Sequence, residues 1–117
     1  MPQIHFTVNY QVKQKRKFAD FLNRFAKQNG LELRDLIIER YPKFPEQFQA
    51  RFHIETSSSG KEEQVFEILK LAQKLAKKGS WTWRLDDKPL DSDVYFECIF
   101  NNWDHDDEPV KWALIST

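Results

Sequence analysis

The spacing of apolar residues switches between a period of two and helical spacing, and this switch constrains the fold more than any other sequence feature. From Ile4 to Val12 every second residue is apolar or aromatic, which is typical of a β-strand with one buried face. From Lys13 the apolar residues instead follow the spacing of an amphipathic helix. They are Phe18, Phe21, Leu22, Phe25 and Ala26. Asn29-Gly30 then supplies a left-handed stop for that helix.

A predicted hairpin follows this first helix. The stretch from Leu31 to Tyr41 is rich in apolar and β-branched residues and predicts a second strand, which Pro42 and Pro45 close. Alternation returns between Phe48 and Ile54 and predicts a third strand. The two strands therefore predict a β-hairpin with a proline-bounded loop.

A second helix is predicted after the polar loop at residues 56–60. Ser59, followed three residues later by Glu62, can form a capping box at its start. Lysines gather before Gly79, where the helix dipole favours positive charge. The apolar stripe comprises Val65, Ile68, Leu69, Ala72, Leu75 and Ala76.

Three more strands are predicted in the last third of the chain. Residues 81–85 and 94–100 alternate between apolar and polar side chains. A final alternation places Val110, Trp112 and Leu114 on one face of the last strand. The predicted order of elements is thus β-α-β-β-α-β-β-β.

This order predicts an α+β fold with two helices on one face of a mostly antiparallel sheet. The first six elements match a ferredoxin-like β-α-β-β-α-β unit, to which the last two strands add a C-terminal hairpin. Because 117 residues fit one compact core and no linker is evident, residues 1–117 are expected to form a single domain.

The compartment is inferred from segments that the sequence does not contain. No apolar run approaches the ~20 residues of a membrane span, and the start lacks the pattern of a secretory signal. Cys98 is the only cysteine, which fits a reducing compartment, and its parity with Phe96 and Phe100 points it into the core. We therefore expect a soluble, cytoplasmic protein with an inert thiol.

Charge is divided unevenly along the chain, although the formal net charge is zero. Residues 1–79 carry 15 Lys and Arg against 9 Asp and Glu, a net charge of +6. Residues 80–117 carry 3 against 9, a net charge of −6. If the two parts are also separate in space, the surface is bipolar and steers oppositely charged partners. The alternative is that they neutralise each other across the folded surface.

Two strongly acidic segments flank the strand predicted over residues 94–100. The later one carries Trp103, Asp104, His105, Asp106, Asp107 and Glu108. The earlier one carries Asp86, Asp87, Asp91 and Asp93. Carboxylates beside an aromatic ring suit recognition of a basic protein surface, where the ring is an anchor and the carboxylates pair with Arg or Lys. The alternative is plain solubility, with Trp103 folded back onto the core.

No cofactor is expected, and a metal ion is a minor alternative. Asp104, Asp106 and Glu108 could offer oxygen ligands to a hard cation such as calcium. The segment lacks the glycine-centred turn of a calcium-binding loop, and the chain lacks cysteine and histidine at zinc spacing. A glycine-rich phosphate loop is also absent, so nucleotide hydrolysis is not expected.

His5 and His53 lie on the polar faces of the first and third predicted strands. In a ferredoxin-like sheet these strands pair at the centre, which would place both imidazoles opposite the helices. Their expected neighbours are Thr7, Asn9, Arg51 and Glu55. Imidazoles beside hydroxyl and guanidinium groups can perform acid-base work on a phosphodiester. The alternative is that these residues are solvated cross-strand partners.

One histidine segment resembles a known signature. His5-Phe6-Thr7 is similar to one half of the signature of the two-histidine phosphoesterases. His53-Ile54-Glu55 departs from the other half, because Glu55 stands where Thr or Ser belongs. The resemblance implies a catalytic role for His5, Thr7 and His53.

Nucleic-acid binding would instead use the basic residues of the two helices. These are Lys13, Lys15, Arg16, Lys17, Arg24, Lys27, Lys74, Lys77 and Lys78. The exposed aromatic residues of an RNA-recognition strand are absent from Gln49 to Glu55, and the net charge of zero falls short of a basic footprint. A solvated helix face is the alternative.

These patterns favour a non-enzymatic module that binds another protein through its acidic, Trp103-bearing segments, with Trp112 and Trp83 supporting the sheet. Because a nuclease must present a basic cleft to its substrate, an inhibitor fits this chemistry, such as an immunity protein or antitoxin for a bacterial nuclease toxin. The alternatives are a phosphoesterase or RNA-processing enzyme that uses His5 and His53, and an RNA-binding domain. The sequence leaves the oligomeric state open.

Overall fold

The computed structural model of the chain describes residues 3–44, 46–57, 60–85, 96–102 and 108–117. Two helices and six strands follow the predicted order. The elements are β1 (Gln3–Gln11), α1 (Lys15–Asn29), β2 (Arg34–Arg40), β3 (Gln47–Glu55), α2 (Lys61–Leu75), β4 (Ser80–Leu85), β5 (Phe96–Asn101) and β6 (Val110–Ser116). No helix within the described ranges is both long enough and apolar enough to cross a membrane.

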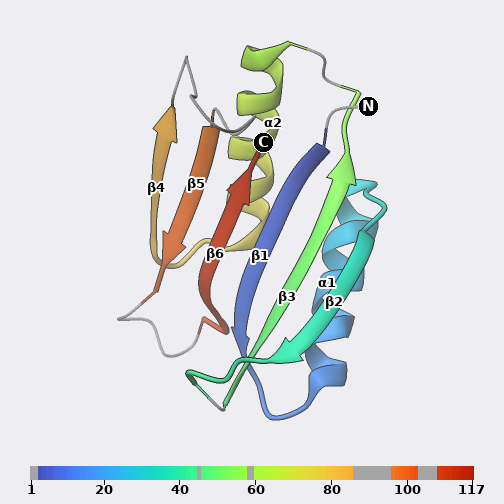
Figure 1. Cartoon of the computed structure of the whole chain (residues 1–117), viewed down its shortest axis with the longest axis vertical. Coiled ribbons are helices and arrows are strands. Elements are labelled where there is room, and N and C mark those ends of the chain that lie inside the picture. Colours follow the sequence, from blue (N-terminus) through green and yellow to red (C-terminus); the bar gives the residue numbers. More distant parts are fainter. Residues whose placement is uncertain (1–2, 45, 58–59, 86–95, 103–107) are drawn as a thin grey trace.

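The strands form one antiparallel sheet in the order β2-β3-β1-β6-β5-β4. Both helices pack on the same face, α1 behind β3 and β2 and α2 behind β5 and β6 (Figure 1). The α+β class with two helices on one side of an antiparallel sheet is therefore confirmed. We call the opposite side of the sheet, which neither helix covers, the open face.

The sheet order differs from the ferredoxin-like arrangement with an added hairpin. There, the strand that follows the second helix pairs with the first strand. Here β6 takes that place beside β1, and β4 lies at the outer edge. The reason lies in composition, because β6 is apolar on both faces from Trp112 to Ile115, as a central strand is. β4 exposes Thr82 and Arg84, which an edge tolerates.

Helix α1 buries the predicted stripe. Phe18, Leu22 and Phe25 are almost fully buried against the sheet, and the Phe18 ring stacks on Tyr10 of β1 with 4.7 Å between centroids. Gly30 ends the helix with φ +64°, a left-handed conformation that glycine adopts without strain. The pattern therefore predicted this helix correctly.

Helix α2 is rotated relative to its predicted stripe. Leu71 and Gln64 are buried, whereas Leu69 is 38% exposed. The predicted and observed stripes share Ile68, Ala72 and Leu75. Leu71 lines a groove together with Gln28 and Asn29 of α1. The N-cap of the helix is Gly60, which has no side chain to form a cap, and Ser59 of the predicted capping box lies outside the described residues.

A β-bulge in β6 reverses the expected alternation of that strand. Tyr10 pairs with Val110, but its neighbour Asn9 pairs with Trp112, so Lys111 is an extra residue. Val110 faces the core, while Trp112 turns to the open face, and Ala113 becomes fully buried. The prediction that Val110, Trp112 and Leu114 share one face is therefore wrong.

The core lies between the sheet and the helices and is rich in aromatic residues. Phe6 stacks on Phe52 at 4.7 Å between centroids, and Trp81 contacts Phe100 at 5.0 Å. Cys98 is 1% exposed within this core, as its parity predicted. Burial raises the pKa of its thiol to about 11, with the nearby Glu97 carboxylate adding to the effect. Such a thiol is a weak nucleophile.

Candidate functional site

Most of the predicted acidic site lies outside the described residues. This holds for Trp103, Asp104, His105, Asp106, Asp107, Asp86, Asp87, Asp91 and Asp93. Glu108 is described, is half-buried, and precedes β6. Its carboxylate contributes to raising the pKa of the Tyr10 hydroxyl, although burial of that hydroxyl is the larger cause.

The base of the later acidic segment is held by Asn102. Its side-chain amide donates hydrogen bonds to the carbonyl oxygens of Val110, at 3.1 Å, and Glu108, at 3.3 Å. Its backbone N–H donates to the carbonyl of Lys111. Asn102 is 4% exposed, so these bonds satisfy a buried amide. The described residues on either side of 103–107 are thereby fixed to each other.

The two acidic segments flank opposite ends of β5. Leu85 and Phe96, which border residues 86–95, pair at one end of the β4–β5 ladder. Asn101, close to the start of the other segment, pairs with Ser80 at the other end. Residues 86–95 and 103–107 therefore enter the described fold at opposite ends of the sheet.

The sheet order also separates the two parts of the sequence in space. Strands β2, β3 and β1 form one half of the sheet, and β6, β5 and β4 form the other (Figure 1). The basic helix α1 lies behind the first half, and its residues Lys15, Arg16, Lys17 and Lys27 are exposed. Both acidic segments join strands of the second half. Residues 3–55 thus form one half of the sheet with α1 behind it, whereas α2, which also belongs to residues 1–79, packs behind the other half.

The open face is organised as rows of residues that are opposite one another across the strands. One row, here the histidine row, runs through Arg34, His53, His5, Ser116, Glu97 and Arg84. Another row, here the amide row, runs through Glu39, Gln49, Asn9, Trp112, Asn101 and Ser80. From His5 to Asn9 the rows are about 14 Å apart along the strand.

The histidine row brings His5 and His53 together, as the sequence predicted. They are paired residues of β1 and β3, and their ring centroids are 5.8 Å apart. The Nδ1 atom of His53 lies 3.4 Å from a carboxylate oxygen of Asp35. The pKa of His5 is lowered, mainly by desolvation and further by the neighbouring His53. A lowered pKa leaves His5 neutral and able to accept a proton near neutral pH.

The remaining charged groups around the histidines are paired. Arg34 lies 3.8 Å from Glu55, the residue that departs from the phosphoesterase signature. Arg51, which is opposite Thr7, lies 3.7 Å from Glu39. These ion pairs are exposed at their Arg ends and contribute little to stability. Thr7 and Arg51 accompany the two histidines as expected.

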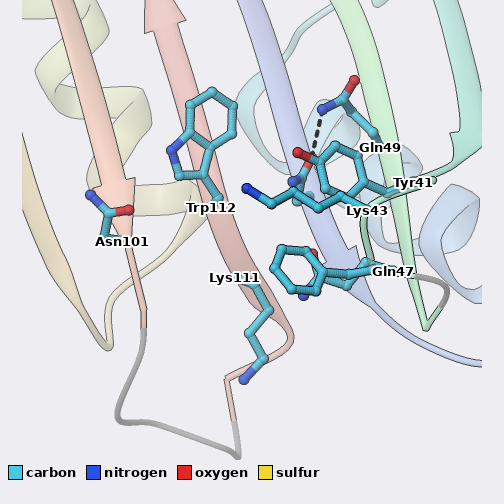
Figure 2. A pocket seen from close by; sticks show the side chains of 9 residues that line it. Tyr41, Lys43, Gln47, Gln49, Asn101, Lys111 and Trp112 are labelled. Atoms are coloured by element: carbon cyan, nitrogen blue, oxygen red, sulfur yellow. Dashed lines mark hydrogen bonds between the residues drawn. The ribbon is translucent and has the colours of Figure 1, made fainter.

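The amide row borders a pocket of about 300 Å³, which the sequence did not predict (Figure 2). Described residues that line it are Asn9, Tyr41, Lys43, Phe44, Gln47, Gln49, Asn101, Lys111 and Trp112. The amide of Gln49 donates a 2.9 Å hydrogen bond to the side-chain oxygen of Asn9. This bond orients both amides within the pocket lining.

The aromatic wall of the pocket comes from the connection between β2 and β3. The N–H of Phe44 donates to the carbonyl of Tyr41, and the N–H of Gln47 donates to that of Phe44. These bonds fold the segment so that the two rings stack, with centroids 5.9 Å apart. Trp112 lines the pocket from β6 (Figure 2). The proline-bounded loop thus forms one side of the pocket.

Two tryptophans that were expected to support the sheet have different positions. Trp112 is half-buried on the open face because of the bulge in β6. Trp83 lies in the edge strand β4, where its side chain is 65% exposed and its ring centroid is 6.2 Å from that of Phe96. Neither lies within the core.

The pocket was missed because its signals are dispersed. Trp112 lies in a run that is apolar in both alternating phases, so only the bulge decides its face. Asn9 and Gln49 read as ordinary polar residues of half-buried strands. Tyr41-Pro42-Lys43-Phe44 combines two aromatic residues with a lysine in a turn, and this was the one local signal available.

Comparisons with protein-family models, curated proteins and solved structures find no match to this chain. The class of the protein is thus given by its fold: it is an α+β protein with an antiparallel sheet whose open face neither helix covers. Among the residues that the structure describes, no three or more His, Cys, Asp or Glu side chains gather as a metal site would require. Of the carboxylates considered for calcium, Asp104 and Asp106 lie outside that part of the chain.

Proposed function

We propose that this protein is a non-enzymatic binding module that recognises a partner protein with a basic surface. The observation that carries the proposal is the sheet order, because it separates strands of residues 3–55 from strands of residues 80–116. The described strands of residues 80–117, the part of the sequence with a net charge of −6, therefore form the half of the sheet that basic helix α1 does not cover. A one-signed surface of this kind accelerates encounter with a partner of opposite charge.

The proposed contact uses the segment after β5. Trp103 is the apolar anchor, and Asp104, Asp106, Asp107 and Glu108 pair with Arg and Lys of the partner. The hydrogen bonds of Asn102 at the base of the segment reduce the ordering cost of binding. The partner class that this chemistry favours is a nuclease, whose basic cleft this protein would block as an immunity protein or antitoxin does.

The test compares two variants that each remove four charges. The acidic variant is Asp104→Asn/Asp106→Asn/Asp107→Asn/Glu108→Gln. The matched control is Lys15→Gln/Arg16→Gln/Lys17→Gln/Lys27→Gln on α1, where all four side chains are exposed. Each protein is immobilised and used to capture partners from the native host, and both proteins and nucleic acids are identified. We expect one basic protein to be retained by the wild type and the control and lost by the acidic variant.

Kinetics with the captured partner then test the mechanism. Association with the acidic variant should be slower by about tenfold or more, and its rate should depend less steeply on salt. Inhibition of a nuclease activity of that partner would establish the inhibitor class. RNA that is recovered by the wild type and lost by the α1 variant would contradict the proposal and favour RNA binding by the basic helices.

A second candidate function is a phosphoesterase, because one observation favours it. His5 and His53 are paired across β1 and β3 with ring centroids 5.8 Å apart, and His5 has a lowered pKa. One neutral imidazole can accept a proton while a protonated one donates it. Arg51 and Thr7 lie beside them on the open face, where they can contact a phosphate.

This candidate is tested with a simple phosphodiester such as bis(p-nitrophenyl) phosphate. His5→Gln/His53→Gln should abolish turnover while the far-ultraviolet circular dichroism stays unchanged, because both side chains lie outside the core. The acidic variant should retain full turnover. Absence of turnover in the wild type would remove the candidate.

A further inference from the structure

The pocket beside the amide row combines three kinds of side chain that neither proposed function uses. Aromatic rings form its walls, carboxamides line it, and two lysines lie at its border (Figure 2). Its volume of about 300 Å³ is at the lower end of the range of about 300–1,000 Å³ for small-molecule sites. A compact ligand with one ring system is the size that it can hold.

The walls favour a flat ring. Tyr41, which stacks on Phe44, lines the pocket from the loop, and Trp112 lines it from β6 (Figure 2). Each of these rings offers a π-face, and stacking between aromatic faces is favourable for any planar, electron-poor ring. Trp112 is half-buried on the open face, so part of its ring is accessible for such a contact.

The amides favour a ring with hydrogen-bonding edges. Asn9 is 6% exposed and accepts a hydrogen bond from Gln49, which fixes both side chains. Asn101 borders the pocket from β5, on the other side of Trp112 (Figure 2). Each carboxamide carries donors as well as an acceptor, which is the complement of the mixed edge of a nucleobase.

The charges favour an anion on that ring. The described lining includes Lys43 and Lys111 and no carboxylate. The Lys43 ammonium lies 5.8 Å from the Phe44 ring centroid, so positive charge and aromatic face are adjacent. A cationic ligand would be repelled by both lysines, whereas a phosphate attached to a stacked ring would reach them.

We propose that this pocket binds a nucleobase together with its phosphate, either in a free nucleotide or in a single strand of nucleic acid. The base stacks on the aromatic lining formed by Trp112, Tyr41 and Phe44, Asn9 and Gln49 contact its edge, and Lys43 and Lys111 contact the phosphate. The described lining of this site shares no residue with the acidic segments or with His5 and His53. It holds or fails independently of the proposed protein partner.

The probes separate the two sources of the ligand. The four nucleoside 5′-monophosphates are titrated by calorimetry, and fluorescein-labelled octaribonucleotides of A and of U are titrated by fluorescence anisotropy. Saturable binding of a mononucleotide identifies a free-nucleotide site, and binding of octamers alone identifies a strand-binding site. Both outcomes support the pocket if they respond to the variants below.

Three variants alter the pocket, and one serves as a charge-matched control. Tyr41→Ala removes a ring from the loop, and Trp112→Leu removes the opposite ring while keeping an apolar side chain. Lys43→Gln/Lys111→Gln removes the positive charge. The control, Lys61→Gln/Lys70→Gln, removes the same charge from exposed positions of α2 that are not among the basic residues considered for nucleic-acid binding. Thermal unfolding shows that each variant is folded before it is titrated.

Loss of either ring should weaken binding by about tenfold or more, because replacing an aromatic side chain on which a base stacks has an effect of this size in other nucleic-acid-binding proteins. The lysine variant should weaken binding and make it less dependent on salt, and the control should bind like the wild type. Nucleosides without phosphate should bind at least about tenfold more weakly than nucleotides. Absence of binding by every probe at millimolar concentration would overturn the proposal. Equal weakening by the control would do the same, because it would indicate non-specific attraction to lysines.

Discussion

The two faces of the sheet use the same strands for different purposes. Towards the helices, Ile4, Phe6 and Val8 of β1 are at most 1% exposed. Towards the open side, His5 and Thr7, which alternate with them, are partly exposed and face ionisable and polar partners on β3. The alternating pattern therefore fixes the fold through one set of side chains and leaves the other set available for chemistry.

The open face is nevertheless ordered in detail. Its Arg residues have carboxylate partners in Arg34–Glu55, Arg51–Glu39 and Arg84–Glu97, and its buried amide Asn9 is hydrogen-bonded. Within the described ranges, no buried side-chain nitrogen or oxygen lacks a hydrogen-bond partner. A polar face with this much pairing can hold side chains in place for recognition without contributing much to the stability of the fold.

The sharpest test of the comparison uses neighbours on one strand that point to opposite faces. Ile115 is fully buried, so Ile115→Ala should lower the free energy of unfolding by about 2–5 kcal/mol. Leu114 is half-buried on the open face, so Leu114→Ala should cost about 1 kcal/mol. Urea denaturation of both variants measures the difference. Equal losses would mean that the open face is a second core covered by another surface.

A second test uses the buried thiol. Because the pKa of Cys98 is raised from 9.0 to about 11 in the folded protein, its thiolate favours the unfolded state. The corresponding stability is present below pH 9 and is lost as the pH rises through about 11, up to about 3 kcal/mol in total. Urea denaturation between these pH values should show a smaller loss for Cys98→Ala than for the wild type. Identical pH profiles would place the thiol outside the core.

A third test concerns the residue through which the chain enters β4. A methyl group at Gly79 would lie 2.5 Å from the Phe100 ring and 2.9 Å from the carbonyl oxygen of Asn101. A backbone carbonyl cannot move aside as the end of a flexible side chain can, and φ at this position is +147°. Gly79→Ala should therefore lower the free energy of unfolding by about 1–3 kcal/mol. Gly30→Ala is the control, since its methyl group would meet nothing within 4 Å and the cost is only that of positive φ. Calorimetric melting of the two variants should rank Gly79→Ala as the less stable.

The core face could be predicted from sequence because burial there follows local periodicity. The stripe of Phe18, Leu22 and Phe25 and the alternation of β1 gave the correct elements and the correct interior residues. Sheet order could not be predicted from the sequence, because it depends on whether β4 or β6 packs better between two neighbouring strands. Contacts between residues far apart in the chain decide this. The apolar character of β6 on both faces was visible, but its alternation was read as a half-buried strand.

The open face was predictable only where two strands are certain to pair. The juxtaposition of His5 and His53 followed from pairing of β1 with β3 and is confirmed. The pocket depends on the bulge at Lys111 and on a turn that stacks Tyr41 on Phe44, and neither has a periodic signature. The acidic segments remain a prediction from charge alone, because the residues between Leu85 and Phe96 and between Asn102 and Glu108 lie outside the described fold.

The smallest expected effect on stability comes from His5 on the open face. Desolvation and the adjacent His53 lower the pKa of His5 below its usual value of 6.5, so the unfolded chain binds a proton at that site more readily than the folded one. Stability from this group is complete above pH 6.5 and declines as the pH falls through that value. His5→Gln should therefore flatten the pH dependence of the unfolding free energy between about pH 7.5 and about pH 5.5, measured with urea.

The other groups around the pair decide whether that effect belongs to His5. Asp35 faces His53, and Glu55 faces Arg34. His53→Gln is the informative control, because it removes the repulsion of His5 but leaves its desolvation. It should reduce the slope without abolishing it, as desolvation is the larger cause. If the slope vanished with His53→Gln alone, repulsion from His53, and not desolvation, would be the dominant cause of the lowered pKa of His5.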